Sequence, residues 1–255
     1  MGPKFSASFL LLAASAGIRA ASLNLCTDEY LLLLAEPRQV VGVSYLARDR
    51  RETALWRQAQ RYPGNRGSIE DVLPLRPNLL LTSGGGGRAT ALLARRAGIR
   101  TIDVPYASDL DGVAANMRNV AAALGNPARA APWLRRLDAL RRDAPQRAAD
   151  AMWISAGGFS LAPDSLGAQW LRLAGLGQRP LPGARATLET LLTKPPKIMI
   201  RSDYRSGEMS GGNRWLAHPI VRRAGARQIV TDGRPWTCVG PLMIPEIERL
   251  KRLVH

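Results

Sequence analysis

The sequence has few of the side chains on which most enzyme chemistry depends. Its 255 residues include only two histidines, His218 and His255, and two cysteines. Histidine is the usual acid–base group near neutral pH and a frequent zinc ligand. Its scarcity argues against a hydrolase or a metalloenzyme. His218 lies in a predicted helix just before Pro219, which favours a structural role.

Long hydrophobic runs are also missing. Beyond residue 20, no segment reaches the roughly 18 apolar residues that a membrane-spanning helix needs. Residues 1–20 resemble a secretory signal, because Lys4 precedes a short apolar stretch from Phe5 to Gly17. Ile18-Arg19-Ala20 is the expected cleavage site, and the alternative is an N-terminal tail or an uncleaved anchor. We therefore expect an exported, soluble protein in the periplasm.

No familiar catalytic motif is present. The glycine run 84–87 lacks the Gly-Lys-Ser/Thr of a phosphate loop and the spacing of a dinucleotide fingerprint. The acidic pairs Asp28/Glu29 and Asp109/Asp111 have no partner motif, and helix capping explains them better than acid–base catalysis. We expect no catalytic residue and no cofactor.

Basic residues outnumber acidic ones, with 36 Lys and Arg against 20 Asp and Glu and a formal net charge of +16. Such an excess makes nucleic acid a partner to test. The basic residues are scattered, however, and form no run interleaved with stacking aromatics and no helix-turn-helix or zinc-finger spacing. We expect a solvated basic surface and no nucleic-acid partner. Attraction to an anionic solute or membrane surface is the alternative.

Strand and helix patterns alternate in two stretches, 21–126 and 149–255. In the first we expect strands at 40–44, 79–82 and 101–104, and helices at 29–34, 71–75, 90–97 and 110–124. In the second we expect strands at 152–155, 197–200 and 228–231, and helices at 165–174, 188–193, 213–224 and 245–253. Such alternation is typical of parallel α/β sheets.

The segment between these stretches, 127–148, has no strand signal. Its Leu134, Leu137 and Leu140 fall on one face among arginines, which predicts one amphipathic helix from Pro127 to about Arg147, roughly 30 Å long. The predicted fold class is α/β, with two Rossmann-like parallel-sheet lobes joined by a single long rigid helix. The domains are a signal peptide (1–20), two lobes (21–126 and 149–255) and the interlobe helix (127–148).

A similar phrase occurs in each lobe, from Ile69 to Leu81 and from Leu188 to Ile200. Each runs from an apolar residue and a Glu through a short helix and a basic–Pro pair into a strand. With Ser22-Leu23-Asn24, the 41–45 strand and the glycine run, these phrases resemble the helical-backbone (class III) periplasmic solute-binding proteins of ABC importers. These serve vitamin B12, iron-siderophores and haem, and the vitamin B12-binding members are the most similar.

The resemblance covers nearly all of the chain beyond the signal. It implies that the ligand lies between the lobes and that one exposed Glu on each lobe docks onto Arg residues of the permease. Glu70 and Glu189 stand at those positions, and charge-assisted bonds from Arg suit the role. The alternative is that each Glu only complements the dipole of its helix.

Ligands bind parallel α/β lobes at the carboxyl ends of the strands. The loops expected there carry aromatic and Arg side chains, which suit a large, planar or anionic solute, and a glycine run that a bulky ligand can approach closely. The candidate contacts are Cys26, Tyr45, Asn65, Arg66, Ser83, Gly84 and Gly85 in the first lobe, and Phe159, Tyr204, Trp215, Trp236 and Cys238 in the second. For each aromatic the alternative is core packing.

The two cysteines are expected on loops that border the cleft from opposite lobes. Three interpretations of Cys26 and Cys238 stay open. They ligate a soft metal or a metal-bearing solute, they form a disulfide, or they are independent buried thiols.

These features together predict the substrate-binding component of an ABC importer, which is a monomer and not an enzyme. It captures a corrinoid, haem or metal chelate between its lobes and delivers it to the inner-membrane permease. Two alternatives remain. One is an exported sensor or scaffold of the same fold without transport, and the other is a metallocluster-type oxidoreductase, for which two cysteines are too few.

Overall fold

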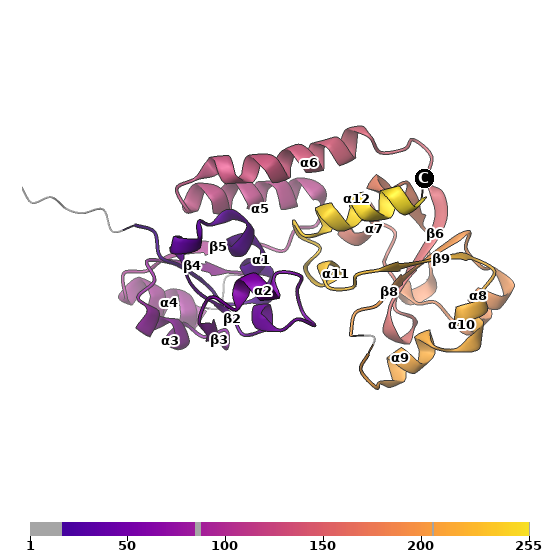
Figure 1. Cartoon of the computed structure of the whole chain (residues 1–255), viewed down its shortest axis with the longest axis horizontal. Coiled ribbons are helices and arrows are strands. Elements are labelled where there is room, and N and C mark those ends of the chain that lie inside the picture. The colour runs from indigo at the N-terminus through magenta and orange to yellow at the C-terminus, as the bar shows by residue number, and fades with distance from the viewer. Residues whose placement is uncertain (1–16, 85–87, 206, 255) are drawn as a thin grey trace, which may run out of the picture.

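The first lobe is built on a five-stranded parallel sheet with strand order β3-β2-β1-β4-β5. The computed structural model describes residues 17–84, 88–205 and 207–254 (Figure 1). The strands are β1 (Ala20–Ser22), β2 (Val40–Ser44), β3 (Gly64–Asn65), β4 (Leu79–Thr82) and β5 (Arg100–Asp103). The helices are α1 (Leu25–Leu34), α2 (Trp56–Ala59), α3 (Ile69–Val72), α4 (Arg88–Arg96) and α5 (Leu110–Ala123).

The second lobe repeats this plan with a four-stranded parallel sheet of order β7-β6-β8-β9. Its strands are β6 (Ala149–Ile154), β7 (Leu176–Gln178), β8 (Ile198–Ser202) and β9 (Arg227–Thr231). Its helices are α7 (Leu166–Leu173), α8 (Leu188–Thr193), α9 (Gly211–Leu216), α10 (Pro219–Arg223), α11 (Pro235–Cys238) and α12 (Met243–Val254). The predicted class of two parallel α/β lobes is confirmed.

Each central strand is apolar on both faces because helices cover both sides of its sheet. In β4, Leu79 and Leu81 pack into the cluster that holds α1 and α5, whereas Leu80 packs against α3 and α4. The strand β8 alternates in the same way. The α1–α5 cluster continues into the second lobe through α7 and α12, so one apolar core joins the lobes.

The link between the lobes is shorter than the predicted helix. A 3₁₀ turn (Pro127–Ala130) leads into α6 (Ala131–Arg142), which lies beside α5 as a helical hairpin (Figure 1). The helix ends at Arg142 because Pro145 disfavours helical backbone at the residue before it. An ion pair of 2.6 Å between Arg136 and Glu248 fixes α6 to α12. The connection is therefore a bundle of three helices.

Two helix boundaries also differ from expectation. The cap of α1 is Asn24, whose side chain accepts hydrogen bonds from the backbone N–H groups of Cys26 and Thr27, so the helix starts before the predicted caps. The helix expected over 213–224 is divided into α9 and α10. His218 separates them and caps α10 by accepting from the N–H of Ile220 at 3.2 Å, which confirms its structural role. Among the described helices, none has the length and apolarity needed to cross a bilayer.

The folded lobe begins before residue 21. Ala20 is fully buried in β1, and the Arg19 side chain donates to the carbonyls of Leu75 and Arg76. Cleavage after Ala20 removes these contacts. We therefore predict that processing during export occurs after Ala16, where Ala14-Ser15-Ala16 supplies small residues, and that the mature chain starts at Gly17. Intact mass of the exported protein measures this, and a chain starting at Ala21 contradicts it.

Candidate functional site between the lobes

The carboxyl edges of the two sheets meet. The loop after β2 touches the loops after β8 and β9 through side chains that cross from one lobe to the other. The Tyr204 hydroxyl donates to Glu52 at 2.6 Å, Arg51 lies 3.2 Å from Glu208, and Arg234 donates to the Arg50 carbonyl at 3.0 Å. These bonds place the strand ends of both lobes around a common interlobe site.

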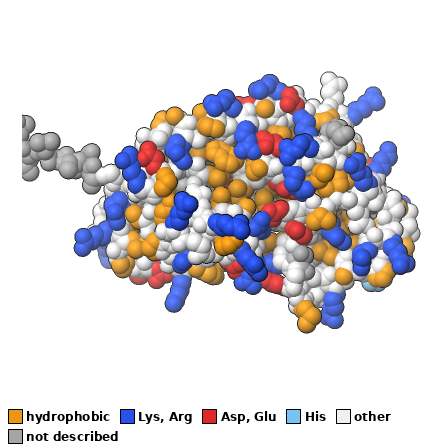
Figure 2. All heavy atoms as spheres, viewed as in Figure 1, with side chains coloured by type: hydrophobic (Ala, Val, Ile, Leu, Met, Phe, Trp, Pro, Cys, Tyr) orange, Lys and Arg blue, Asp and Glu red, His pale blue; other side chains and the backbone are white. Residues whose placement is uncertain are grey.

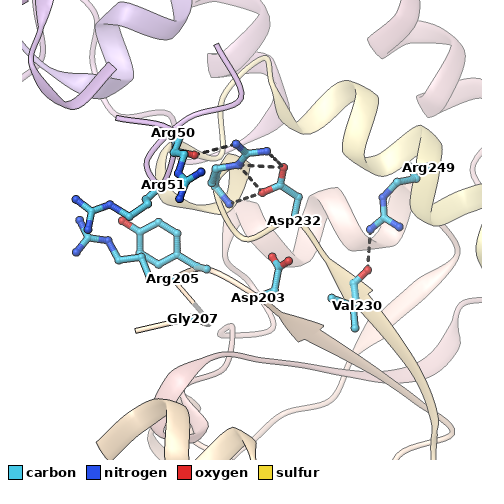
Figure 3. A pocket seen from close by; sticks show the side chains of 10 residues that line it. Arg50, Arg51, Asp203, Arg205, Gly207, Val230, Asp232 and Arg249 are labelled. Carbon is cyan, nitrogen blue, oxygen red and sulfur yellow. Dashed lines mark hydrogen bonds and ion pairs between the residues drawn. The ribbon is translucent and has the colours of Figure 1, made fainter. Parts of the chain in front are cut away.

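A pocket of about 470 Å³ lies at this junction. Figure 3 shows its wall, and Figure 2 shows basic and acidic side chains gathered where the lobes meet. The pocket is lined by Arg50 and Arg51 from the first lobe and by Asp203, Tyr204, Arg205, Gly207, Val230, Asp232, Arg234 and Arg249 from the second. Most of these arginines are already neutralised: Arg205 pairs with Glu52, Arg234 with Asp232 and Arg249 with Glu246.

The ion pairs set the protonation of the pocket. Burial alone would raise the pKa of Asp232, but hydrogen bonds from Arg234 outweigh it and hold that pKa below its usual range. Burial and the hydrogen bond to Glu52 raise the pKa of Tyr204, so its hydroxyl stays protonated and donates. Glu52, only 4% exposed, also accepts from Arg205. The charged side chains of this pocket therefore mainly bind one another and hold the lobes together, and they do not form an open anion site.

The two cysteines form a disulfide. Cys26 at the start of α1 and Cys238 at the end of α11 are bonded, with their Cα atoms 5.3 Å apart. The bond ties the first lobe to the second and leaves neither sulfur as a thiolate ligand, so the interpretations as metal ligands and as independent thiols are wrong. Within the described residues, no group of three or more His, Cys, Asp or Glu side chains is placed to hold a metal ion.

Two buried carboxyl groups lie beside the disulfide on α1. Glu29 accepts from the N–H of Leu242 at 2.5 Å, a further hydrogen bond between the lobes, and burial raises its pKa to about 8. Asp28 accepts from the backbone N–H and the hydroxyl of Ser44, and burial raises its pKa to about 7. A Cβ on Gly240 would lie 2.9 Å from a carboxyl oxygen of Glu29, so a larger residue at this position would displace the Glu29 side chain.

Two of the predicted aromatics lie exposed at the facing edges. Tyr45, after β2, is 58% exposed, and Phe159, after β6, is 56% exposed. Such exposure of large apolar side chains on both sides of a lobe junction suits a ligand surface. Tyr204 lies at the same edge, where its hydroxyl donates a hydrogen bond to Glu52.

Three other predicted contacts are packed into the lobes. Trp236 is buried, donates its indole N–H to Thr231 at 2.8 Å and packs 5.2 Å from Trp153, so its ring belongs to the core. Asn65 is 2% exposed and its amide donates to the carbonyls of Ser22 in β1 and Val43 in β2, so it holds the sheet together. Trp215 lies half-buried beneath the loop after β6.

The remaining predicted contacts line the first lobe's edge. Arg66 is exposed after β3, and Ser83 and Gly84 follow β4. Gly85 lies outside the described residues. Tyr106, which the sequence patterns did not single out, is 77% exposed and its ring lies near Gly84. Its position two residues after the buried Val104 at the end of β5 is the signal that could have found it.

The two predicted docking residues occupy equivalent places. Glu70 is the second residue of α3, which Ser68 caps, and Glu189 is the second residue of α8, which Thr187 caps. Both carboxylates are exposed, and no ion pair with either is found in the described part of the chain. The repeated phrase is thus one structural element used in both lobes.

Comparison with known proteins agrees with this architecture. A family model described as periplasmic binding protein matches residues 21–177, more than half of the chain. No curated protein matches the sequence. Several solved structures share the fold at low identity.

The periplasmic haem-binding protein HutB of Vibrio cholerae is 18% identical with a TM-score of 0.67, over 93% of this chain and 99% of that one. The haem-binding protein BhuT, solved with two haems, is 21% identical with a TM-score of 0.66, over 92% and 96% of the two chains. The vitamin B12-binding protein BtuF of Vibrio cholerae is 18% identical with a TM-score of 0.62, over 92% and 95%. The chain belongs to the periplasmic binding protein family, in its class III form of two lobes joined through helices.

Proposed function

We propose that the chain is the exported, periplasmic binding component of an ABC importer and captures a large solute between its lobes. The solute is a corrinoid, haem or metal chelate, which the chain delivers to an inner-membrane permease. The family supports this proposal, as do the haem and vitamin B12 bound by proteins of similar fold. The observation that carries it is the exposed pair of aromatic rings, Tyr45 and Phe159, at facing edges of separate lobes.

Absorbance titration tests the proposal. The purified chain is titrated with haemin, cyanocobalamin and a ferric siderophore, and dissociation constants are measured for the unchanged chain and for a Tyr45→Ala, Phe159→Ala variant. We expect micromolar or tighter binding of at least one solute and at least a tenfold loss in the variant, since each ring supplies a large contact surface. Absence of binding to all three contradicts the proposal.

We propose further that α3 and α8 dock onto the permease. Each carries an exposed Glu, and an exposed leucine follows three residues later: Leu73, directly after α3, is 39% exposed, and Leu192, within α8, is 64% exposed. Residues three apart share a helical face, so each lobe presents a carboxylate beside an apolar side chain. This arrangement suits a partner with an Arg next to an apolar surface on each of two equivalent subunits.

Charge reversal at both positions, Glu70→Lys with Glu189→Lys, is expected to abolish transport in a reconstituted importer while ligand affinity stays unchanged. The reason is that Lys repels the Arg residues that the carboxylates would meet, and neither Glu lies at the interlobe site. The matched control is Asp138→Lys with Asp164→Lys, which changes the net charge equally at exposed positions of other segments. Transport that survives Glu reversal contradicts the docking role, and solute binding without any transport by the unchanged chain favours a sensor.

A further inference from the structure

The loop after β6 is fastened to a second segment, 184–186, by backbone bonds. Phe159 and Arg185 form an antiparallel bridge. The N–H of Ser160 donates to the Ala184 carbonyl, and the N–H of Ala186 donates to the Gly158 carbonyl, both at 2.8 Å. The two side chains at this bridge are therefore held in fixed relation to each other.

The same loop is packed tightly from below. A Cβ on Gly158, whose φ is +77°, would lie 2.5 Å from the Ala186 carbonyl and 2.9 Å from the Trp215 ring. The loop can approach α9 this closely only because residue 158 is glycine. The loop thus holds Phe159 with more than half of its surface exposed, although phenylalanine side chains are most often buried.

Arg185 lies over this ring. Its guanidinium carbon is 4.6 Å from the ring centroid of Phe159, and its Nε donates to the Gly157 carbonyl at 3.1 Å. No carboxylate of the described residues forms an ion pair with it. This differs from Arg205, Arg234 and Arg249 of the interlobe pocket, each of which is neutralised by an acid.

We infer that Phe159 and Arg185 together form a recognition platform for a carboxylate attached to a flat apolar ring system. This inference rests on the proposed function and specifies its solute. The ring offers a stacking surface, and the guanidinium nitrogens that do not bond Gly157 can donate to a carboxylate in a paired geometry. Because backbone bridging and stacking already restrict Arg185, little side-chain freedom is lost on binding.

The test compares iron(III) protoporphyrin IX, which carries two free carboxylates, with its dimethyl ester, which carries none. Dissociation constants of both are measured by absorbance for the unchanged chain, Arg185→Gln and Arg185→Lys. The matched control is Arg223→Gln, which removes an exposed arginine from α10. We expect Arg185→Gln to weaken binding of the acid roughly tenfold, with Arg185→Lys intermediate, since charge-assisted bonds to carboxylates carry about that much affinity.

The unchanged chain is expected to bind the ester more weakly than the acid, because the ester lacks the carboxylate that Arg185 would contact. For the same reason, Arg185→Gln should bind the ester as tightly as the unchanged chain does. An equal loss for acid and ester, or no loss for the acid, overturns the platform while leaving the proposed function standing. If the unchanged chain binds cyanocobalamin or the ferric siderophore but neither porphyrin, this inference alone is overturned. If it binds none of these solutes, the proposed function is overturned and this inference with it.

Discussion

Replacing Cys26 and Cys238 by serine is expected to lower the free energy of unfolding by up to about 5 kcal/mol. The disulfide joins residues 212 apart in sequence, and chain-entropy arguments assign the largest stabilisation to cross-links that close long loops. Urea unfolding monitored by tryptophan fluorescence measures the change. It also reports whether the lobes unfold together, which the shared apolar core predicts.

The reduced wild-type chain supplies the control for this experiment. A thiol reductant should bring its unfolding midpoint close to that of the serine variant, and the reductant should leave the serine variant itself unchanged. Equal midpoints for the oxidised wild-type chain and the serine variant contradict the stabilising role of the bond.

Stability is expected to fall as the pH rises from about 4.5 to about 8, and Glu29 is the principal cause. Burial raises the pKa of Glu29 from 4.5 to about 8, so the folded chain holds this proton over a range in which the unfolded chain has lost it. The folded state binds more protons than the unfolded state in this window, so low pH favours it. The contribution of Glu29 to the free energy of unfolding is therefore full below the unfolded pKa, declines as the pH rises through the window, and stays constant above the folded pKa. Asp28, with its pKa raised to about 7, acts in the same direction.

The variant Glu29→Gln is expected to lose much of this slope and to be more stable than wild type by a few kcal/mol at pH 8. Its neutral amide still accepts from the Leu242 N–H and carries no charge into the core. Urea midpoints at pH 5, 6.5 and 8.5 measure the effect. Glu70→Gln, at an exposed position, is the matched control and should keep the wild-type slope. Parallel pH profiles for wild type and Glu29→Gln would show that another group is responsible.

Most of the secondary structure could be predicted because each strand or helix depends mainly on the residues within it and at its ends. The strands β2 and β4 and the helix α8 lie at the predicted residues: β2 is rich in β-branched residues, β4 is an apolar run after Pro77, and Thr187 caps α8. The strands β3 and β7, at sheet edges with two and three residues, carry too little pattern to be recognised. The helix expected over 127–147 is shorter in the structure, because a 3₁₀ turn occupies 127–130 and Pro145 disfavours helical backbone at the residue before it.

The interlobe contacts were not predictable in the same way. Glu52 and Tyr204 are 152 residues apart, and nothing in the neighbourhood of either side chain marks the other as its partner. Trp236 was expected at the ligand because it follows a strand, but Thr231 and Trp153 hold it in the core. The cysteine pair had three chemical outcomes that only the distance between the two Cα atoms could separate.

The disulfide has a mechanical consequence as well. The main chain passes between the lobes once, through α6, and the bond between α1 and α11 supplies a second covalent attachment at a separate place. Two covalent attachments at separate places favour rotation about the line through both over sliding or twisting of one lobe on the other, and the apolar core that the lobes share opposes sliding as well. Under the proposed function, a solute enters by a swing of the lobes about this axis, and the side chains farthest from the axis travel the greatest distance.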